Sequence, residues 1–351
     1  MRRGNNGGIM NPDFDRNEYY SRQTVLSELG PAGQDQLRRS KVTLVGLGGL
    51  GSVTALYLAL AGVGELTLID QDTVELNNLH RQAIYSLSDI RHPKVEVAAS
   101  KLAKVNPEVK LISIADNVNK ENLREIIGDT DCIVDGLDNM RTRYLLNRYS
   151  VEHQIPFVFG GAIGLEGNVA VFKPPTTPCL ECALPGLDDS NLATCNTRGV
   201  LGATTGIIGS LQALETVKVL ARVNSNFETK LMIFDFAQSE FRSIPLSIRK
   251  DCPVCQAKQE LPPIETKLAW LCGSNTVNVN PEHPLSLDLN KVSKLLAKNC
   301  KILLTTPIVL VVDYDGHEIS IFRKGRTLIK NVESEEDALR LYREVNKIIR
   351  A

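Results

Sequence analysis

The stretch from Lys41 to Asp72 constrains the fold more than any other part of this chain. Residues 42–45 are a short apolar run with β-branched side chains, residues 52–61 are mostly good helix formers, and residues 66–69 are a second apolar run. A strand, a helix and a strand in this order form a β-α-β unit, in which the two strands are parallel. We therefore expect an α/β protein with a mostly parallel, Rossmann-like sheet.

A glycine-rich turn joins the first strand of this unit to its helix. Gly46, Gly48 and Gly51 form a GxGxxG pattern, and Asp70 ends the second strand. Glycines let backbone amides approach a phosphate at the helix N-terminus, and the carboxylate can accept hydrogen bonds from a ribose. The pattern predicts a nucleotide without identifying it, because NAD and FAD enzymes share it. The chain has no GxxxxGK[ST] motif, so a bound ATP would need cations from other segments.

Length and charge limit the classes of partner. The chain has 351 residues, of which 43% are hydrophobic and 23% charged, and this suits one large domain and a small one. Its 40 Lys and Arg residues balance 41 Asp and Glu residues, so we expect no nucleic-acid surface. The longest apolar run, near residues 53–63, is too short to span a bilayer, and no segment resembles a signal peptide. We expect a cytoplasmic protein without membrane contact.

The patterns divide the chain into three parts. Residues 1–15 lack periodicity and are expected to form a flexible tail, residues 16–258 a large α/β domain with a polar loop at about 183–203, and residues 259–351 a small α+β domain. The expected helices lie at 23–29, 32–39, 94–105, 120–127, 141–153, 202–220 and 289–296, and from Ser334 onward. The further expected strands lie at 110–114, 132–135, 157–160, 168–172, 232–236, 269–271, 276–279, 302–314 and 318–322, the last two flanking an Asp315-Gly316 turn.

Half of the 8 cysteines form two CxxC pairs, Cys179 with Cys182 and Cys252 with Cys255. Two thiolate pairs on tight turns can close a tetrahedral Zn²⁺ site. Four thiolates leave no open position for water, so we expect this zinc to be structural.

The other cysteines carry different expectations. Cys195 lies in the polar segment TCNTR, where exposure and the neighbouring Arg198 would favour a reactive thiolate; the alternative is an incidental loop cysteine. Cys132 lies in an apolar expected strand and is expected in a core, and Cys272 and Cys300 have no partner spacing and are expected to be packed as well.

Three segments place charges where ATP would need them. Arg81 and Lys94 supply cations, and Asp138 with Asn139 follows the expected strand at 132–135. Ligands of open α/β sheets bind at the carboxyl ends of the strands. Two cations and a carboxylate that could hold Mg²⁺ are the groups that a triphosphate requires.

Several motifs, in order, closely resemble the ThiF/MoeB/HesA family over residues 17–255. They are GLGGLG, LIDQDTVELNNLHRQ, HPKVE, DGLDN, the CxxC pairs and the helix IGSLQALE. The resemblance implies an adenylyltransferase that uses ATP to activate the C-terminal glycine of a ubiquitin-like or sulfur-carrier protein ending in Gly-Gly. Thioester formation or sulfur transfer would follow, with a conjugating enzyme or a sulfur donor as a further partner.

The resemblance also implies roles for particular residues. Asp138 would bind Mg²⁺ and nucleotide, Arg22 would reach the ATP of the neighbouring subunit in a homodimer, and Cys195 would form a thioester or persulfide with the carrier. The implied nucleotide contacts are Gly46, Gly48, Gly49 and Gly51 for phosphates, Asp70 for the ribose with Asp72 just beyond it, and Asn78, Arg81, Gln82 and Lys94 for phosphates.

The C-terminal region departs from the family pattern, in which members end near the second CxxC or continue into a rhodanese domain. Residues 259–351 resemble neither, and could form a ubiquitin-fold-like module that recruits a partner or an appendage that stabilises a dimer. Three other functions stay open: an NAD(P)-dependent oxidoreductase, an enzyme that adenylates a small molecule or a tRNA base, and a non-catalytic subunit that supports a catalytic partner.

Overall fold

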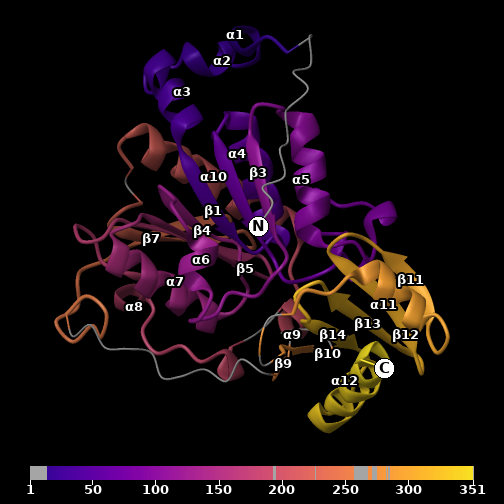
Figure 1. Cartoon of the computed structure of the whole chain (residues 1–351). Helices are drawn as coiled ribbons and strands as arrows, with labels where there is room; N and C mark the ends of the chain where they lie inside the picture. Colours follow the sequence, from indigo (N-terminus) through magenta and orange to yellow (C-terminus); the bar gives the residue numbers. More distant parts are fainter. Residues whose placement is uncertain are drawn as a thin grey trace.

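The computed structural model describes residues 14–350 except 193–194, 226, 257–267, 271–274, 282 and 284. The expected tail at 1–15 therefore lies almost wholly outside the described residues. Two sheets organise the chain: one of eight strands in the order β3-β2-β1-β4-β5-β6-β7-β8, and one of six in the order β11-β12-β13-β14-β10-β9 (Figure 1). No helix in the described part of the chain is long and apolar enough to cross a bilayer.

The larger sheet is parallel in one half and antiparallel in the other. Strands β1 to β5 run parallel to one another, while β6, β7 and β8 continue the sheet as antiparallel neighbours. The expected mostly parallel α/β sheet is confirmed. The strands are β1 (Lys41–Val45), β2 (Glu65–Ile69), β3 (Lys110–Ile114), β4 (Cys132–Asp135), β5 (Phe157–Ile163), β6 (Glu166–Phe172), β7 (Lys230–Asp235) and β8 (Glu240–Pro245).

Helices cover both faces of this sheet. Val42 and Leu44 of β1 pack into a core with helices α4 (Gly49–Ala61), α5 (Lys94–Val105) and α10 (Gly202–Ala221). Val45 of β1 packs on the opposite face with α6 (Leu123–Ile127) and α7 (Met140–His153). Successive strand residues point to opposite faces, so this part of the chain has three layers: helices, the sheet, and helices.

The N-terminal segment differs from its expected helices. Instead of one helix at 23–29, the structure has α1 (Arg16–Tyr19) and α2 (Ser21–Thr24), followed by turns. The next helix, α3 (Gly30–Arg39), includes Gly30 and Pro31, which were expected to separate two helices. Proline fits the first turn of a helix because its missing N–H would have no partner there.

The smaller sheet is antiparallel in all of its described pairs. It consists of β9 (Leu268–Trp270), β10 (Thr276–Val279), β11 (Lys301–Thr305), β12 (Val309–Tyr314), β13 (His317–Phe322) and β14 (Thr327–Lys330). The single strand expected at 302–314 is wrong, because residues 306–308 turn between β11 and β12. Strand β14 was not expected. The Asp315-Gly316 turn is confirmed, with φ of 53° and 79°.

The two faces of the smaller sheet contact different parts of the molecule. Leu310, Ile319 and Ile329 pack under α11 (Leu289–Leu296) and α12 (Glu335–Arg350). Leu328 and its neighbours on the other face pack against Ala115, which follows β3 of the larger sheet. The smaller sheet therefore lies beside the carboxyl ends of strands in the larger one (Figure 1).

Candidate functional site

A cleft with a volume of about 1310 Å³ lies at the carboxyl ends of the parallel strands. It is lined by eleven of the residues expected to contact a nucleotide, namely Gly46, Gly48, Gly49, Asp70, Asp72, Asn78, Arg81, Gln82, Lys94, Asp138 and Asn139. These residues come from four segments separated in the sequence. The structure therefore brings together in one cleft the glycine turn, two cations and the carboxylate that the sequence indicated.

The glycine turn is shaped by close backbone contacts. Gly46 has a φ of 91°, and a Cβ atom there would lie 2.5 Å from the carbonyl oxygen of Gly136. A Cβ atom at Gly51 would lie 1.9 Å from the carbonyl oxygen of Gly46. Gly51 is not among the residues that line the cleft, so its part is to let α4 pack against the turn.

Asp70 holds the glycine turn from the end of β2. One oxygen of its carboxylate accepts a hydrogen bond from the Leu47 amide at 2.6 Å, and the other accepts one from the Asp72 amide at 2.7 Å. Burial raises the pKa of Asp70, while the nearby ammonium group of Lys94 opposes that change. The carboxylate is thus part of the frame of the cleft as well as a group that faces it.

Lys94 is a buried cation at the start of α5. It is 5% exposed, and its Nζ donates to Asp72 Oδ2 at 2.9 Å. Burial alone would lower the pKa of Lys94, but the carboxylates of Asp72 and Asp70 outweigh it and raise that pKa above its ordinary value. Among the described residues, the buried Oδ1 of Asp72 has no hydrogen-bond partner. A ligand in the cleft therefore meets a charged ammonium and a free acceptor.

The segment after β2 adds one more cation and two amides. Arg81 is partly buried, and its Nη1 donates to the carbonyl oxygen of Asn77 at 2.7 Å. Asn78 and Gln82 are 7% and 3% exposed. No described group pairs with the buried Oε1 of Gln82. An unpaired amide beside the glycine turn suits a ligand that brings its own polar groups.

Asp138 is exposed, lines the cleft and lies in the turn after β4, which is the neighbour of β1 on the side away from β2. The neighbouring Asn139 caps α7, because its Oδ1 accepts from the Thr142 amide at 2.9 Å. Asn139 also donates to Asp138 Oδ1 at 3.4 Å. Asp138 is thus the group of this turn whose carboxylate is available to a cation.

A buried ion pair, which the sequence did not predict, lies next to the turn that carries Asp138. Arg143 Nε lies 2.9 Å from Asp135 Oδ2, and its Nη2 donates to the carbonyl oxygens of Leu137 and Gly160 at 2.6 Å and 2.8 Å. Burial raises the pKa of Asp135 to about 6, and Arg143 opposes that change. The pair fixes the turn that carries Asp138. The only signal in the sequence was the first aspartate of DGLDN, which ends an apolar strand.

The polar loop expected at about 183–203 forms part of the cleft wall. Asp189 accepts hydrogen bonds from the amides of Met140 and Arg141, at 2.6 Å and 3.0 Å, and so caps α7 next to Asp138. The short helix α9 (Cys195–Arg198) begins at Cys195, whose side chain lies outside what the structure describes. Arg198 pairs with Glu166, so its guanidinium is directed to that carboxylate.

Arg22 is not among the cleft-lining residues. It lies on α2 and is exposed. The structure thus separates Arg22 from the other expected site residues of the same chain.

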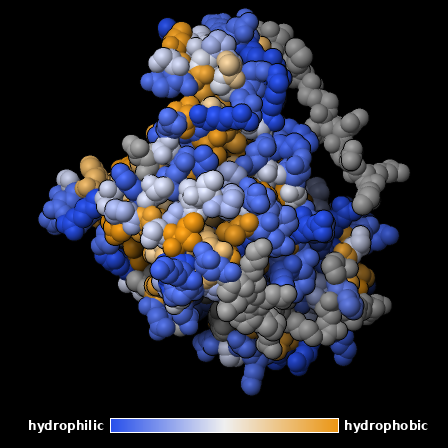
Figure 2. All heavy atoms as spheres, turned by 90° about the vertical axis from the view of Figure 1, so that its left-hand side faces the viewer, coloured by the Kyte–Doolittle hydropathy of each residue, from blue (hydrophilic) through white to orange (hydrophobic). Residues whose placement is uncertain are grey.

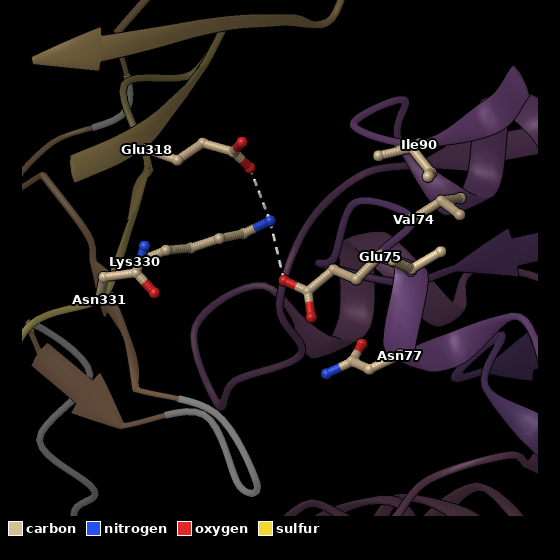
Figure 3. A pocket seen from close by; sticks show the side chains of 8 residues that line it. Val74, Glu75, Asn77, Ile90, Glu318, Lys330 and Asn331 are labelled. Atoms are coloured by element: carbon tan, nitrogen blue, oxygen red, sulfur yellow. Dashed lines mark hydrogen bonds and ion pairs between the residues drawn. The ribbon is translucent and has the colours of Figure 1, made fainter. Parts of the chain in front are cut away.

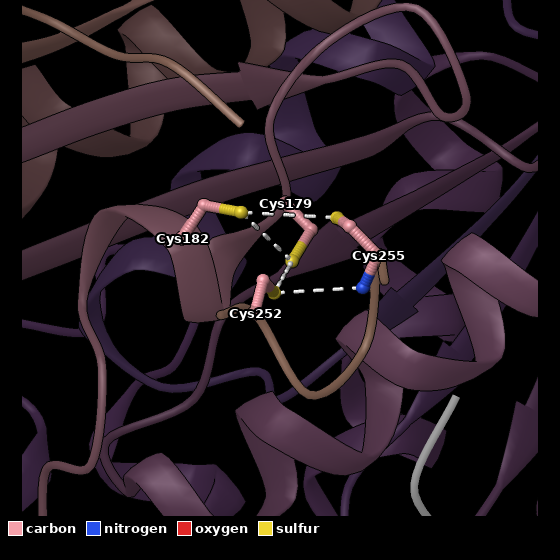
Figure 4. Close-up of side chains that lie close together, drawn as sticks. All are labelled: Cys179, Cys182, Cys252 and Cys255. Carbon is pink, nitrogen blue, oxygen red and sulfur yellow. Dashed lines mark hydrogen bonds between the residues drawn. The ribbon is translucent and has the colours of Figure 1, made fainter. Parts of the chain in front are cut away.

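The four cysteines of the CxxC pairs form a compact cluster (Figure 4). Their Sγ atoms all lie within 4.8 Å of one another, with 3.7 Å from Cys179 to Cys252 and 3.7 Å from Cys182 to Cys255. Tetrahedral coordination with Zn–S bonds of about 2.3 Å requires S···S separations of about 3.8 Å. The cluster therefore has the ligand set and the spacing for a tetrahedral metal ion.

The remaining thiols are consistent with core positions where they are described. Cys132 and Cys300 are buried, and burial raises the pKa of both thiols. Cys272 lies outside the described residues.

Comparisons with known proteins identify related chains. Residues 20–254 match the sequence model of the ThiF family. The adenylyltransferase and sulfurtransferase MOCS3 of Aedes aegypti is 41% identical over 244 residues, which are 69% of this chain and 56% of that protein. This chain thus spans about half the length of such relatives. The SAMP-activating enzyme E1 of Haloferax volcanii is 37% identical over 244 residues, 69% of this chain and 90% of that protein.

One relative also matches the C-terminal region. The sulfur carrier protein ThiS adenylyltransferase of Bacillus subtilis is 32% identical over 331 residues, which cover 92% of this chain and 97% of that protein. The expectation that such relatives end near the second CxxC is therefore wrong for this one.

Solved structures resemble the larger part of the chain. A crystal structure of E. coli MccB with MccA-N7isoASN has a TM-score of 0.62 and 25% identity, and covers 68% of this chain and 76% of that one. The structure of E. coli MccB with ATP has a TM-score of 0.58 and 25% identity, and covers 64% of this chain and 69% of that one.

Proposed function

The chain belongs to the ThiF family, and from this membership we propose that its cleft binds ATP and adenylates the C-terminal glycine of a ubiquitin-like or sulfur-carrier protein. The observation that carries the proposal is the convergence of the glycine turn, Lys94, Arg81 and Asp138 on one cleft. An NAD(P)-dependent oxidoreductase would have no use for these two cations and the carboxylate. Relatives named as adenylyltransferases for sulfur carriers support the same reaction.

The proposed reaction brings two anions together. A carboxylate oxygen of the carrier's terminal glycine attacks the α-phosphorus of ATP. The bond from that phosphorus to the pyrophosphate oxygen breaks, pyrophosphate leaves with the electron pair, and an acyl-adenylate remains. Attack requires that the negative charge of the phosphates be neutralised and the reactants be held in line.

The residues of this chain divide that task. Lys94 and Arg81 would face the phosphates with positive charge, and the amides of the glycine turn would donate to phosphate oxygens. Asp138 would hold Mg²⁺, which would neutralise part of the phosphate charge. Lys94 would exchange its contact with Asp72 for a phosphate oxygen, since both are acceptors for the same ammonium.

Dependence on a carrier is the direct test of this function. We expect the chain to catalyse exchange of labelled pyrophosphate into ATP only when a Gly-Gly-ending carrier from the same organism is present. Deleting the terminal glycine of the carrier should abolish the exchange. Exchange supported by a peptide or a small molecule, but by no such carrier, would favour one of the alternative substrates. The likeness to the structure of MccB with MccA is the reason to include a peptide in the test.

We infer a homodimer in which Arg22 of one subunit completes the site of the other. The exposure of Arg22 and its position outside its own cleft support this arrangement. The adjacent Val25 and Leu26 are 77% and 52% exposed, which suits a surface that a second subunit covers. Further apolar patches lie on the side of the molecule seen in Figure 2.

Mixing two inactive variants would test the shared site. Arg22→Ala and Asp138→Ala homodimers should each be inactive, because every site lacks one essential charge. If Arg22 acts across the interface, a heterodimer has one site with both groups, and a random 1:1 mixture should recover about a quarter of wild-type exchange. Native mass spectrometry should establish that subunits have exchanged. Mixed dimers without recovered exchange would show that Arg22 acts within its own subunit, and full exchange in the Arg22→Ala homodimer would show that Arg22 takes no part.

The CxxC cluster would hold a structural Zn²⁺, since four thiolates occupy all positions of a tetrahedral ion. This ion would tie α8 (Leu180–Ala183) to the turn after β8. It would lie outside the reacting groups, because none of its ligands lines the cleft.

Cys195 would act after adenylation, by attacking the acyl carbon and releasing AMP to form a thioester. Sulfide from a donor is the alternative nucleophile. We expect Cys195→Ala to leave carrier-dependent pyrophosphate exchange within about twofold of wild type, because the thiol takes no part in the first step. The variant should lose the thiol-sensitive adduct with the carrier seen on non-reducing gels. Persistence of that adduct would exclude Cys195 as the nucleophile.

A further inference from the structure

One face of a two-stranded ribbon in the smaller sheet lines the same cleft. Thr276 and Asn278 of β10, and Leu328 and Lys330 of β14, are all cleft-lining residues. The strands pair Thr276 with Lys330 and Asn278 with Leu328, so these four side chains lie on one face. The intervening Val277 and Ile329 point to the opposite face, into the core under α11 and α12. The C-terminal domain therefore presents a continuous, mainly polar strip to the cleft.

Ion pairs hold this strip against the larger domain. Lys330 Nζ lies 2.8 Å from Glu75, in the loop after β2, and 2.8 Å from Glu318 on the neighbouring strand β13 (Figure 3). Glu318 also lies 2.8 Å from Arg91 of the larger domain. These partly buried charges link two segments of the larger domain to one edge of the smaller sheet.

Arg326 makes the most deeply buried of these contacts. It is 2% exposed, and its guanidinium lies 3.7 Å from the centroid of the Phe322 ring. Its Nη2 donates to the carbonyl oxygen of Gln71 at 2.7 Å and to that of Ala115 at 3.4 Å. These two carbonyls follow β2 and β3. One guanidinium thus joins the segment after β2 to the segment after β3. The first segment contains the cleft-lining residues Asp70 and Asp72, and the second contains Asn117.

The place of this contact suggests which part of the ligand it affects. In nucleotide-binding α/β folds the phosphates lie at the glycine turn and the ribose at the acidic end of the second strand. The base then extends beyond that strand, away from the glycine turn. The ends of β2 and β3, and the strip on β10 and β14, lie in this direction.

We propose that the C-terminal domain forms the wall of the nucleotide site at its base end, and that Arg326 is a positioning residue that fixes the strand ends after β2 and β3 for nucleotide binding. The proposal rests on the function proposed above. It assigns to this domain a part in the first reaction step, in addition to any role that the domain has in contacting a partner.

Hydrogen–deuterium exchange of the intact wild-type chain tests the wall. With Mg²⁺-ATP, we expect slower amide exchange at 46–52, at 70–73 and also at 276–280 and 326–330. Protection of the glycine turn without any change in the two C-terminal segments would contradict the proposed role of the C-terminal domain as a wall of the site. It would still be consistent with ATP binding. An unchanged glycine turn would instead contradict the proposed function itself.

Arg326→Met tests the positioning role. The substitution leaves two carbonyls without their donor, so we expect the Kd for ATP to rise by about tenfold. The KM for the carrier should stay within about twofold of wild type, because the proposal gives Arg326 a part in nucleotide binding alone. Arg326→Lys should recover part of the affinity, and it remains informative if Arg326→Met fails to fold.

Arg91→Met is the matched control, because it removes a guanidinium that joins the same two domains through Glu318 but does not contact these carbonyls. We expect its Kd for ATP to stay near that of wild type. Equal weakening by Arg91→Met and Arg326→Met would show that the effect comes from a looser domain interface, and would overturn the role given to Arg326.

Discussion

Asp138→Ala should reduce carrier-dependent pyrophosphate exchange by at least about a hundredfold. The expected cause is electrostatic: Asp138 is exposed, lines the same cleft as the glycine turn, and accepts a hydrogen bond of 3.4 Å from Asn139. Asp70 already accepts two backbone hydrogen bonds, and Asp72 already holds Lys94. Without Asp138, Mg²⁺ would lose its ligand from the protein, and the charge on the phosphates would oppose attack by a carboxylate.

The measurement needs a control for folding and charge. Asp129→Ala removes a carboxylate that is 90% exposed, pairs with Lys41 and lies before β4, away from the cleft. We expect its exchange rate to match that of wild type. The loss in Asp138→Ala should be partly reversed by raising the Mg²⁺ concentration, since a weakened site can still be filled by mass action. Wild-type exchange in Asp138→Ala would remove the carboxylate from the mechanism.

The parts of the fold that could be predicted are those with a strong local period. Helix α5 and strand β4 match their expected bounds because α5 has a continuous apolar stripe and β4 is an uninterrupted apolar run. Strand β8 was missed because all of its residues are exposed, so it carries no alternation of buried and polar side chains. Strands β11 and β12 were merged because Pro307 was not treated as a break, although proline cannot donate to a ladder.

The site followed from topology more than from any single residue. Parallel strands end at one edge of a sheet, which is why segments around Gly46, Asp70 and Asp138 were expected to meet. The contacts of Arg326 were beyond this reasoning, because 255 residues separate it from Gln71 and no periodic pattern connects them. The Asp135–Arg143 pair was missed for a related reason. The two charges matter because they are buried together, and the sequence does not indicate that burial.

Cys252→Ser should remove one equivalent of bound zinc and lower the apparent unfolding temperature of the larger domain by about 10 °C. Cys252 is fully buried and lies 3.7 Å from Cys179, so its loss leaves a three-thiolate site in an apolar surrounding. The turn at 252–255 contacts the rest of the domain through this cluster and through Val254, which packs with Val151. We expect the segment from β8 to residue 256 to become susceptible to proteolysis before the parallel sheet unfolds.

Zinc content by mass spectrometry and thermal unfolding with and without a chelator would measure the effect. Cys300→Ala is a suitable control, since it deletes a buried thiol in the smaller domain and should keep the zinc content of wild type. The exchange activity of Cys252→Ser at low temperature should stay within about threefold of wild type, because the cluster lies outside the cleft. Full zinc content in Cys252→Ser, or a chelator-insensitive unfolding temperature in wild type, would contradict a structural metal at this cluster.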